Sequence, residues 1–268
     1  MNKKASALFV MALWLVSIFS LFAAGLYRLC AAQLKVSARL EESIKAENAA
    51  LSLLAYAQAR AKTDPWFESM LKFGQLADVG FECSVAGEES KLNLNQASPE
   101  AIARLPGFDR GLAEAISASA FRPFTAGEEL PLVEGMSPEI LSQAGQFITI
   151  HSNGKVNINT ASRQVLFAAG LADDAIDDVI LPFLAGDDKT PGTDDDRIFK
   201  SSQAAIEQVQ GRLGNTAAAQ VQDLFNRRAL DVKSETFNLK IVTKRFDKLL
   251  REYDIIFTAD KLLCWREK

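Results

Sequence analysis

The chain opens with a long run of apolar residues that contains no charged side chain. The run spans residues 5–27, with Lys3 and Lys4 before it and Arg28 directly after it. A helix needs about 20 predominantly apolar residues to cross a bilayer, whereas the apolar part of a secretory signal is about 7–15 residues long. The pattern therefore predicts a membrane-spanning helix, and a secretory signal cut within residues 22–25 is the alternative.

Helical periodicity continues beyond this apolar run. Residues 31–60 contain neither glycine nor proline, and apolar side chains recur among charged ones at Leu40, Ile44, Leu51 and Leu54. Asp64-Pro65 follows, and the residue before a proline disfavours helix. We therefore predict one helix that runs to about Thr63, first apolar all round and then amphipathic.

A short phrase occurs twice in the middle of the chain. Residues 91–98 read KLNLNQAS and residues 155–162 read KVNINTAS. In both copies apolar residues alternate with asparagines, which predicts a short extended stretch. Ser98-Pro99-Glu100 then starts a helix with a capping hydroxyl, a proline at the first helical position and an acid near the positive helix end. We expect the asparagines to hydrogen-bond locally and to fix how the chain enters each helix.

The segments after the two phrases share one plan of helix, break and helix. After the first phrase, Pro106-Gly107 breaks the helix and residues 111–119 form the next one. After the second phrase, Thr160 or Ser162 caps the first helix, and residues 175–183 form the next. The chain therefore repeats a helical unit rather than a single loop.

The pattern changes once more near the carboxyl end. Helical spacing covers residues 203–224, and after Ala229 apolar side chains occupy alternate positions. Alternation is typical of a strand with one buried face. The pattern predicts an antiparallel meander of about three strands, near residues 237–242, 249–257 and 262–265, and an earlier strand at 81–85.

Composition narrows the function only slightly. The 268-residue chain has a formal net charge of −4, which gives no overall attraction to nucleic acid or anionic lipid. The only histidine, His151, is expected on the surface in a turn, and one histidine excludes a histidine-rich metal site. No C-x-x-C pair is present. If the body is exported, a disulfide between Cys83 and Cys264 is one alternative and two thiols are the other.

An acidic loop at residues 186–196 reads GDDKTPGTDDD. Ca²⁺ takes about six to eight oxygen ligands, which closely spaced carboxylates and carbonyls can supply. The spacing is not that of an EF-hand, and a solvated loop is the alternative, but close carboxylates without a cation repel one another. We therefore predict calcium (Ca²⁺) binding by Asp187, Asp188, Asp194, Asp195 and Asp196.

The repeated phrase resembles the helix-hairpin-helix modules of competence-type DNA-uptake proteins. Those modules bind phosphate through backbone N–H groups of a glycine-rich hairpin at the start of the second helix. Here Asp109 replaces the second glycine of that hairpin, and Asp173 and Asp174 lie at the same place in the second copy. Carboxylates repel phosphate, and few Lys or Arg residues surround the hairpins. The resemblance therefore implies the fold, and the acids argue against nucleic-acid binding.

The amino-terminal pattern resembles type IV pilin-like proteins, which carry a short basic leader, a peptidase site and a long apolar helix. The resemblance implies that prepilin peptidase cleaves between Ala5 and Ser6. Ala5 stands where the family usually has glycine, and Val10 stands where it has a glutamate. In most pilins that glutamate is thought to pair with a neighbour's amino terminus, because a charge in an apolar bundle needs a partner. The K-type minor pseudopilin of type II secretion lacks this glutamate and is thought to cap the tip.

The segment between the two phrases also resembles K-type pseudopilins. Residues 124–136 read FTAGEELPLVEGM and follow the F-x-x-x-E-E-L-x-x-V-x-G-M run of that family. The family inserts a helical domain with repeated N-x-N phrases into a pilin-like sheet. It is also associated with calcium, at an acidic motif that follows the first repeat rather than the second.

This resemblance implies an α+β protein with a long N-terminal transmembrane and amphipathic helix. A pilin-like antiparallel sheet would then carry a large inserted helical domain with two helix-hairpin-helix-like repeats. The expected parts are a leader, a transmembrane helix, a pilin-like helix with a first strand, the inserted domain and C-terminal strands, at residues 1–5, 6–28, 29–89, 90–228 and 229–268.

The function implied is that of a non-enzymatic minor pseudopilin. It would cap or initiate the type II secretion pseudopilus with I- and J-type minor pseudopilins, and so support export of folded proteins across the outer membrane. It would be a single-pass inner-membrane protein with a cytoplasmic N-terminus and a periplasmic body. The alternative is a membrane-tethered DNA-binding protein of competence type.

Overall fold

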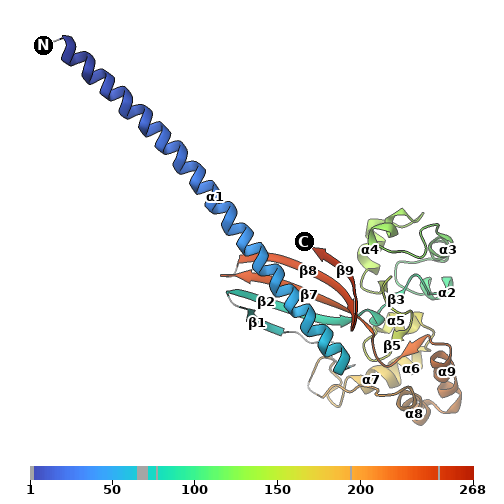
Figure 1. The fold of residues 1–268 in the computed structure, drawn as a ribbon. Helices are drawn as coiled ribbons and strands as arrows, with labels where there is room; N and C mark the ends of the chain where they lie inside the picture. Colours follow the sequence, from blue (N-terminus) through green and yellow to red (C-terminus); the bar gives the residue numbers. More distant parts are fainter. Residues whose placement is uncertain (1–2, 65–71, 77, 194, 247) are drawn as a thin grey trace.

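The computed structural model describes residues 3–64, 72–76, 78–193, 195–246 and 248–268, with side chains from residue 9 onward except at 72, 73 and 76. Its most prominent element is a single helix, α1 (Lys3–Thr63), which lies across a sheet and projects far beyond it (Figure 1). At about 1.5 Å per residue this helix is roughly 90 Å long. The predicted end at Thr63 is confirmed. The helix is continuous up to that point because neither glycine nor proline interrupts residues 31–60.

A five-stranded antiparallel sheet lies against the second half of α1. Its spatial order is β1-β2-β7-β8-β9. The meander β7-β8-β9 and the earlier strand β2 are confirmed, whereas β1 was not predicted, since Gly74 interrupts any strand signal there. The strands are β1 (Lys72–Leu76), β2 (Val79–Gly87), β7 (Thr236–Arg245), β8 (Lys248–Thr258) and β9 (Leu262–Glu267).

The helix contacts the sheet through small side chains. Ala46, Ala50 and Ala57 are buried together with Leu54 against sheet residues such as Ile255. Alanine side chains are small, so they let the helix backbone approach the sheet closely. The bulkier apolar residues of this part of α1 lie mostly outside that contact. Accordingly, Leu40, Ile44 and Leu51 remain 60%, 49% and 47% exposed on another face of α1.

The chain between β2 and β7 forms a separate domain with its own hydrophobic core. Its first half, called unit 1 (residues 91–150), begins at β3 and ends at β4, and these two strands pair in parallel. Its elements, with the short helix η1 that precedes it, are η1 (Glu88–Ser90), β3 (Leu92–Asn93), α2 (Pro99–Ile102), α3 (Arg110–Ala118), η2 (Gly127–Leu132), α4 (Pro138–Ala144) and β4 (Ile148–Thr149).

The second half, called unit 2 (residues 155–232), repeats this plan. It begins at β5 and ends at β6, which again pair in parallel. The sequence repeat is therefore a structural repeat in which an opening strand, helices and a returning strand close one unit. The elements are β5 (Val156–Asn157), α5 (Arg163–Ala168), α6 (Asp173–Ala175), the π-helical turn η3 (Ile176–Ile180), α7 (Leu181–Leu184), α8 (Ser202–Leu213), α9 (Asn215–Asn226) and β6 (Leu230–Asp231).

Two details differ from the sequence-based expectations, and one settles an alternative. The helical region 203–224 consists of α8 and α9, which Gly214 separates at a φ of +84°. Of the two predicted caps of α5, Ser162 is the one present, and its hydroxyl accepts the N–H of Val165 at 3.4 Å. The inserted domain continues past residue 228, because β6 belongs to unit 2.

Candidate functional site

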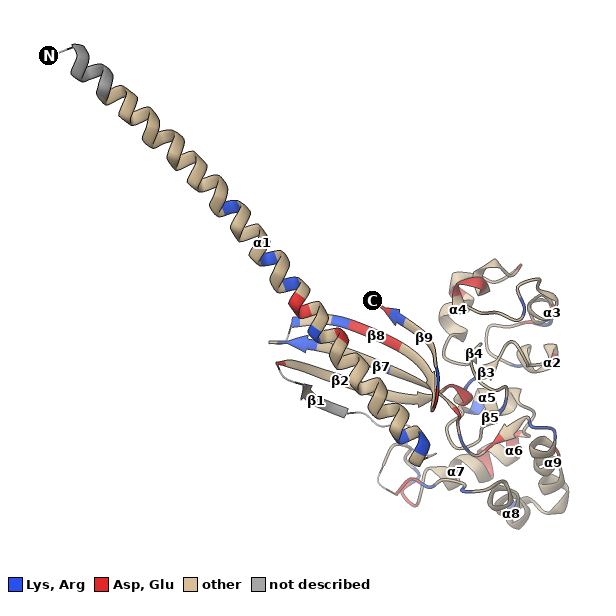
Figure 2. Cartoon of the chain, in the orientation of Figure 1, with Lys and Arg blue, Asp and Glu red and all other residues tan. Residues whose placement is uncertain are grey.

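The apolar half of α1 is uncovered along its whole length. No Lys, Arg, Asp or Glu lies between residue 9 and Arg28, and the charged residues begin on the projecting part of α1 and continue along the part that meets the sheet (Figure 2). Among the described residues, one helix is long and apolar enough to cross a membrane. None of its most apolar 18-residue stretch is buried within the described chain. Val10, at the position of the pilin glutamate, is 49% exposed. Ala5 and Ser6 lie in the first turns of α1, and their side chains are outside the described part.

The asparagines of the first phrase join distant segments of unit 1. Asn93 makes one local bond, in which its Oδ1 accepts the backbone N–H of Asn95 at 2.8 Å, and one distant bond, in which its Nδ2 donates to the carbonyl of Ser152 at 2.5 Å. Asn95 reaches further: its Oδ1 accepts the N–H of Phe124 at 2.7 Å, and its Nδ2 donates to the carbonyls of Phe124 and Ile150. This asparagine therefore joins the opening strand of the unit to its middle loop and its returning strand.

The second phrase repeats these contacts in unit 2. Asn157 Oδ1 accepts the N–H of Asn159 at 3.0 Å. Asn159 Oδ1 accepts the N–H of Phe199 at 2.8 Å, and Nδ2 donates to the carbonyls of Phe199 at 3.0 Å and Val232 at 2.7 Å. The local bonds were predicted, whereas the bonds to distant loops were not. The doubled phrase therefore provides the same structural clamp twice.

The hairpin of unit 1 holds its own carboxylate where a phosphate would bind. Gly107 adopts a φ of +85°, as the Pro-Gly turn requires. Asp109 caps α3, because its Oδ1 accepts the N–H of Leu112 at 2.7 Å. The basic neighbours are also engaged: Arg110 pairs with Glu114 at 2.9 Å, and Arg104 lies over the ring of Phe167.

The corresponding turn of unit 2 is also lined with acids. Asp173 and Asp177 each form an ion pair with Arg163, at 2.6 Å. The Arg163 guanidinium lowers the pKa of Asp177 below its usual range. Asp174 accepts the N–H of Ala175 at 2.8 Å. Both hairpins thus present carboxylates rather than open N–H groups, which disfavours phosphate binding.

The acidic loop forms a network of hydrogen bonds within itself. Asp195 Oδ2 accepts the backbone N–H groups of Asp187 at 2.6 Å and Asp188 at 3.1 Å. Its Oδ1 accepts the hydroxyl of Thr193, and this bond and the two backbone donors lower the pKa of Asp195. Asp194 lies outside the described residues.

The remaining aspartates of this loop also bind donors of the protein. Asp196 Oδ2 accepts the N–H of Gly192 at 2.7 Å, and Asp187 pairs with Arg197 at 2.6 Å. Within the described part of the chain, no group of three or more His, Cys, Asp or Glu side chains is arranged to hold a metal ion. Calcium binding stays a prediction, and it requires these carboxylates to exchange protein donors for the ion.

A calcium titration of thermal unfolding tests that prediction. We expect millimolar Ca²⁺ to raise the free energy of unfolding by about 1–3 kcal/mol if the ion binds only the folded loop. Mg²⁺ should do less, because it loses its water reluctantly. A variant with Asp195→Asn and Asp196→Asn should lose the response, while Asp260→Asn, on the β8–β9 turn outside the loop, should keep it. An equal response in both variants would discard the loop as the site.

Cys83 and Cys264 are not bonded to each other, which contradicts the disulfide alternative. Cys83 lies on β2 and Cys264 on β9, with β7 and β8 between them. Three strand spacings of about 4.8 Å separate β2 from β9 by roughly 14 Å, whereas bonded cysteines need Cα atoms within about 7 Å. Cys83 also faces α1, while Cys264 precedes Trp265, which packs on the α1 side, and so points to the other face.

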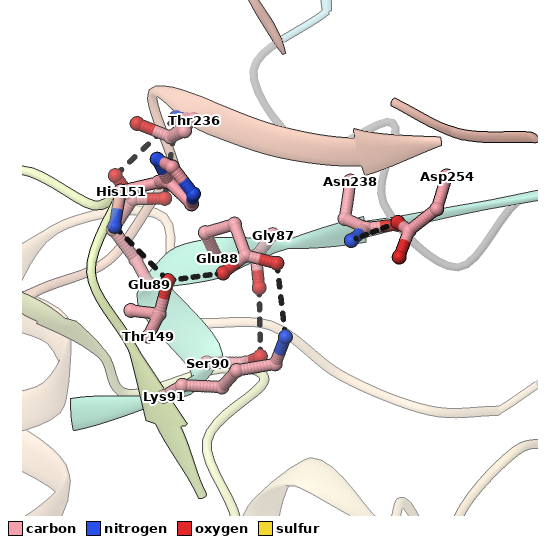
Figure 3. Close-up of polar contacts among 10 residues, drawn as sticks. All are labelled: Gly87, Glu88, Glu89, Ser90, Lys91, Thr149, His151, Thr236, Asn238 and Asp254. Atoms are coloured by element: carbon pink, nitrogen blue, oxygen red, sulfur yellow. Dashed lines mark hydrogen bonds and ion pairs between the residues drawn. The ribbon is translucent and has the colours of Figure 1, made fainter. Parts of the chain in front are cut away.

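A buried polar cluster, called the junction, connects the sheet to both units. The chain leaves β2 at Gly87 and turns through Glu88, which is 2% exposed. Glu88 Oε1 pairs with Lys91 at 2.9 Å, and its Oε2 accepts the hydroxyl of Thr149 on β4 (Figure 3). One buried carboxylate therefore links the start of unit 1 to its returning strand.

Glu89 links the second crossing of the chain. Its carboxylate accepts the N–H of Thr236, where β7 begins, at 3.2 Å and the N–H of Asn153, between the units, at 3.4 Å. The side chain is fully buried. Burial raises the pKa of Glu89 to about 7, although the N–H donors oppose the shift. This group therefore titrates near neutral pH at the point where sheet and both units meet.

His151 lies beside this cluster rather than on the surface. It follows β4 and is half-buried, and burial is the main cause of its lowered pKa. The expected surface position was wrong, because unit 1 packs onto the sheet at this point. Glu88 and Glu89 were also missed from the sequence, where two adjacent acids ahead of Lys91 are typical of a solvated turn.

Comparisons with known proteins find one match to unit 1 and one match to the whole fold. A family model described as a helix-hairpin-helix motif matches residues 87–149, which contain η1 and almost all of unit 1. No curated protein sequence matches the chain. Among solved structures, the chain is similar to one chain of the GspK-GspI-GspJ complex of the type 2 secretion system from enterotoxigenic Escherichia coli, with a TM-score of 0.58 and 14% identity.

This similarity extends over nearly all of both chains. It covers 88% of this chain and 98% of that chain. Neither the inserted domain nor α1 with the sheet reaches that share alone, so the combination of helix, sheet and insertion is common to both. The chain therefore has a pseudopilin-like α+β fold.

Proposed function

We propose that this chain is a minor pseudopilin of the K type, which caps or initiates the pseudopilus of a type II secretion system. The observation that supports this best is the fold shared with a chain of a minor pseudopilin complex. In this role the protein acts by assembly and supports export of folded proteins across the outer membrane. Assembly needs no catalytic group.

The surface of α1 supports assembly through helix packing. Its apolar side chains have no cover within the described chain, so they need lipid before assembly and partner helices afterwards. Lower on α1, Leu40, Ile44 and Leu51 face away from the sheet and extend this apolar surface. A neighbouring pseudopilin helix would bury both parts. The partners proposed are I- and J-type minor pseudopilins, by analogy with the complex of GspK with GspI and GspJ.

A position at the tip fits two further features. Val10 offers no carboxylate to pair with the amino terminus of another subunit, so this chain would lack the contact to a subunit beyond it. The inserted domain also widens the end of the molecule that is farthest from the N-terminus (Figure 1). A wide head of this kind is easier to place at the end of a fibre than inside it.

The proposed topology puts the N-terminus in the cytoplasm and the body in the periplasm. Prepilin peptidase would cut between Ala5 and Ser6. Mass spectrometry of the mature chain, purified from a host with the peptidase, tests this directly. We expect a chain that begins at Ser6, and a full-length chain in a host without the enzyme. A chain that keeps Met1 in both hosts, or begins near Ala24, would remove the pilin-leader interpretation.

A DNA-binding assay separates the proposed role from the competence-type alternative. Both hairpins present carboxylates, so we expect no binding of a 20-base-pair duplex beyond the weak, nonspecific range at moderate salt. Fluorescence anisotropy at two salt concentrations measures this. Tight binding that weakens steeply with salt would favour DNA uptake over secretion.

A further inference from the structure

A cleft lies between unit 1 and the face of the sheet opposite α1. Its volume is about 320 Å³, at the lower end of the roughly 300–1,000 Å³ of small-ligand sites. Tyr253 and Trp265 pack on the α1 side, so the next residues, Asp254 and Arg266, point to the opposite face. We call this space the junction cleft, because the junction forms one of its walls. Its polar lining comes from Glu88, Lys91, Thr149, His151, Asn238, Lys240, Asp254 and Arg266.

A buried acceptor in this cleft has no partner in the protein. Asn238 is 8% exposed, and its Nδ2 donates to Asp254 Oδ1 at 2.8 Å (Figure 3). Because a carboxylate only accepts, this bond fixes the orientation of the amide. The Asn238 Oδ1 is buried, and no described residue donates to it. A buried acceptor left without a donor costs free energy, so the cleft favours a ligand that donates a hydrogen bond here.

His151 adds a second buried polar atom that has no described partner. Its Nε2 is buried and finds no hydrogen-bond partner among the described side chains and backbone groups. It lines the same cleft as Asn238, from the side of unit 1. Two residues that each carry a buried polar atom without a described partner therefore line one cleft from two different parts of the fold.

Two cations of the cleft, Lys240 and Arg266, are not held by strong ion pairs within the described chain. Lys240, Asp254 and Arg266 lie opposite one another across β7, β8 and β9. Asp254 is engaged by Asn238, and Glu88 by Lys91 and Thr149. By contrast, the one ion pair that Arg266 makes within the described chain is a long one, 3.8 Å to Glu128, and Lys240 is exposed and makes none there. The cleft therefore attracts a carboxylate at its mouth and a donor at its base.

The shape of the surroundings suits an extended peptide. Apolar side chains of Leu130, Ile150 and Ile256 line the rest of the cleft. They come from both walls, with Leu130 and Ile150 on the side of unit 1 and Ile256 on β8, so an extended segment in the cleft would lie between apolar side chains.

We propose that the junction cleft binds an acidic, extended segment of a partner protein. A backbone N–H of that segment would donate to Asn238 Oδ1, and its carboxylate would bind Arg266 and Lys240. This proposal concerns a binding site of the folded body and does not depend on assembly through α1.

A peptide titration of the full chain in detergent tests this proposal. The probe is a fluorescein-labelled, capped peptide, Gly-Glu-Gly-Glu-Gly, followed by fluorescence anisotropy, with Gly-Lys-Gly-Lys-Gly and Gly-Gln-Gly-Gln-Gly as controls. We expect saturable binding of the glutamate peptide only, weaker at high salt because the contacts are partly exposed. No binding, or equal binding of the three peptides, would overturn the proposal.

Paired variants localise the binding. Lys240→Glu with Arg266→Glu should lower affinity at least tenfold, and Lys240→Gln with Arg266→Gln should have an intermediate effect. Lys200→Glu, an exposed change in unit 2 outside the cleft, should have none. Circular dichroism checks that each variant is folded, and the neutral pair replaces the charge-reversed pair if that pair is not. Equal losses with Lys200→Glu, or unchanged affinity in the neutral pair, would show that the cleft is not the site.

Discussion

Replacing Asn159 by alanine is expected to destabilise the inserted domain by about 3–5 kcal/mol. Its side chain makes three hydrogen bonds to the backbone of Phe199 and Val232, at 2.7–3.0 Å. Alanine would remove all three and leave an N–H and two carbonyls without partners at the edge of the core. The equivalent Asn95→Ala change in unit 1 should have a similar effect, because Asn95 makes the same bonds to Phe124 and Ile150.

Urea unfolding of the purified chain, followed by near-ultraviolet circular dichroism, measures this loss. Asn48→Ala is a matched control, since Asn48 is exposed on α1 and alanine favours helix. It should change the free energy of unfolding by less than about 0.5 kcal/mol. If the Asn159 and Asn48 variants were equally stable, the phrase N-x-N would not be a clamp.

An aspartate at position 159 tests the direction of these bonds. Asn159→Asp keeps the oxygen that accepts the Phe199 N–H. It replaces the amide NH₂, which donates to two carbonyls, with a negatively charged oxygen. At neutral pH this variant should therefore be at least as unstable as Asn159→Ala. It should recover partly in acid, because a protonated carboxyl can donate one hydrogen bond again. Recovery absent below pH 4 would contradict the assigned donor geometry.

The second large effect concerns Glu89 and pH. Its pKa rises from an ordinary value of 4.5 to about 7 on folding, mainly through burial. The folded state therefore binds more protons than the unfolded state between these values, and stability falls as pH rises through this window. A shift of this size lowers the free energy of unfolding by about 3 kcal/mol. The loss is complete above pH 7, and there is none below pH 4.5.

Glu89→Gln should remove this dependence. The amide stays neutral and keeps an oxygen for the N–H groups of Thr236 and Asn153, so the variant should be more stable than the parent at pH 8 by about 2–3 kcal/mol. Below pH 5 the two proteins should have nearly equal stability. Glu134→Gln, an exposed change in unit 1, should follow the parent at every pH.

Unfolding curves between pH 4.5 and 8.5 give the comparison, and hydrogen exchange at the Thr236 amide shows whether the junction itself responds. Faster exchange of that amide as pH rises, beyond the intrinsic chemical rate, is expected in the parent and not in Glu89→Gln. A parent whose stability increases from pH 5 to 7, with no change in Glu89→Gln, would contradict the assignment.

The long elements could be predicted from the sequence because their signals are local. The end of α1 follows from Asp64-Pro65, and the strands β7 and β8 follow from the alternation of apolar residues in the sequence, although β7 also buries Thr236 and Asn238 on its other face. Ser98 and Ser162 begin helices where their hydroxyls can cap them. Such positions depend on neighbours within a few residues, so a sequence pattern is sufficient.

The junction could not be predicted, since its contacts join residues far apart in the chain. Glu89 is buried because Thr236 and Asn153 come to it, and neither is marked by any periodicity near residue 89. The order β1-β2-β7-β8-β9 likewise separates Cys83 from Cys264, which spacing alone could not show. The asparagine clamps were predicted only in part. Their local bonds follow from the repeated phrase, whereas their partners at Phe124 and Phe199 do not.

Co-purification with I- and J-type minor pseudopilins from the same host tests the proposed role most directly. The tagged chain, extracted in detergent with both partners, should elute as one complex that contains all three. Leu40→Asp with Ile44→Asp, on the exposed face of α1, should release the chain from the complex. Leu132→Asp, equally exposed but on unit 1, should leave it bound. A chain that elutes alone while the other two remain associated would contradict the account.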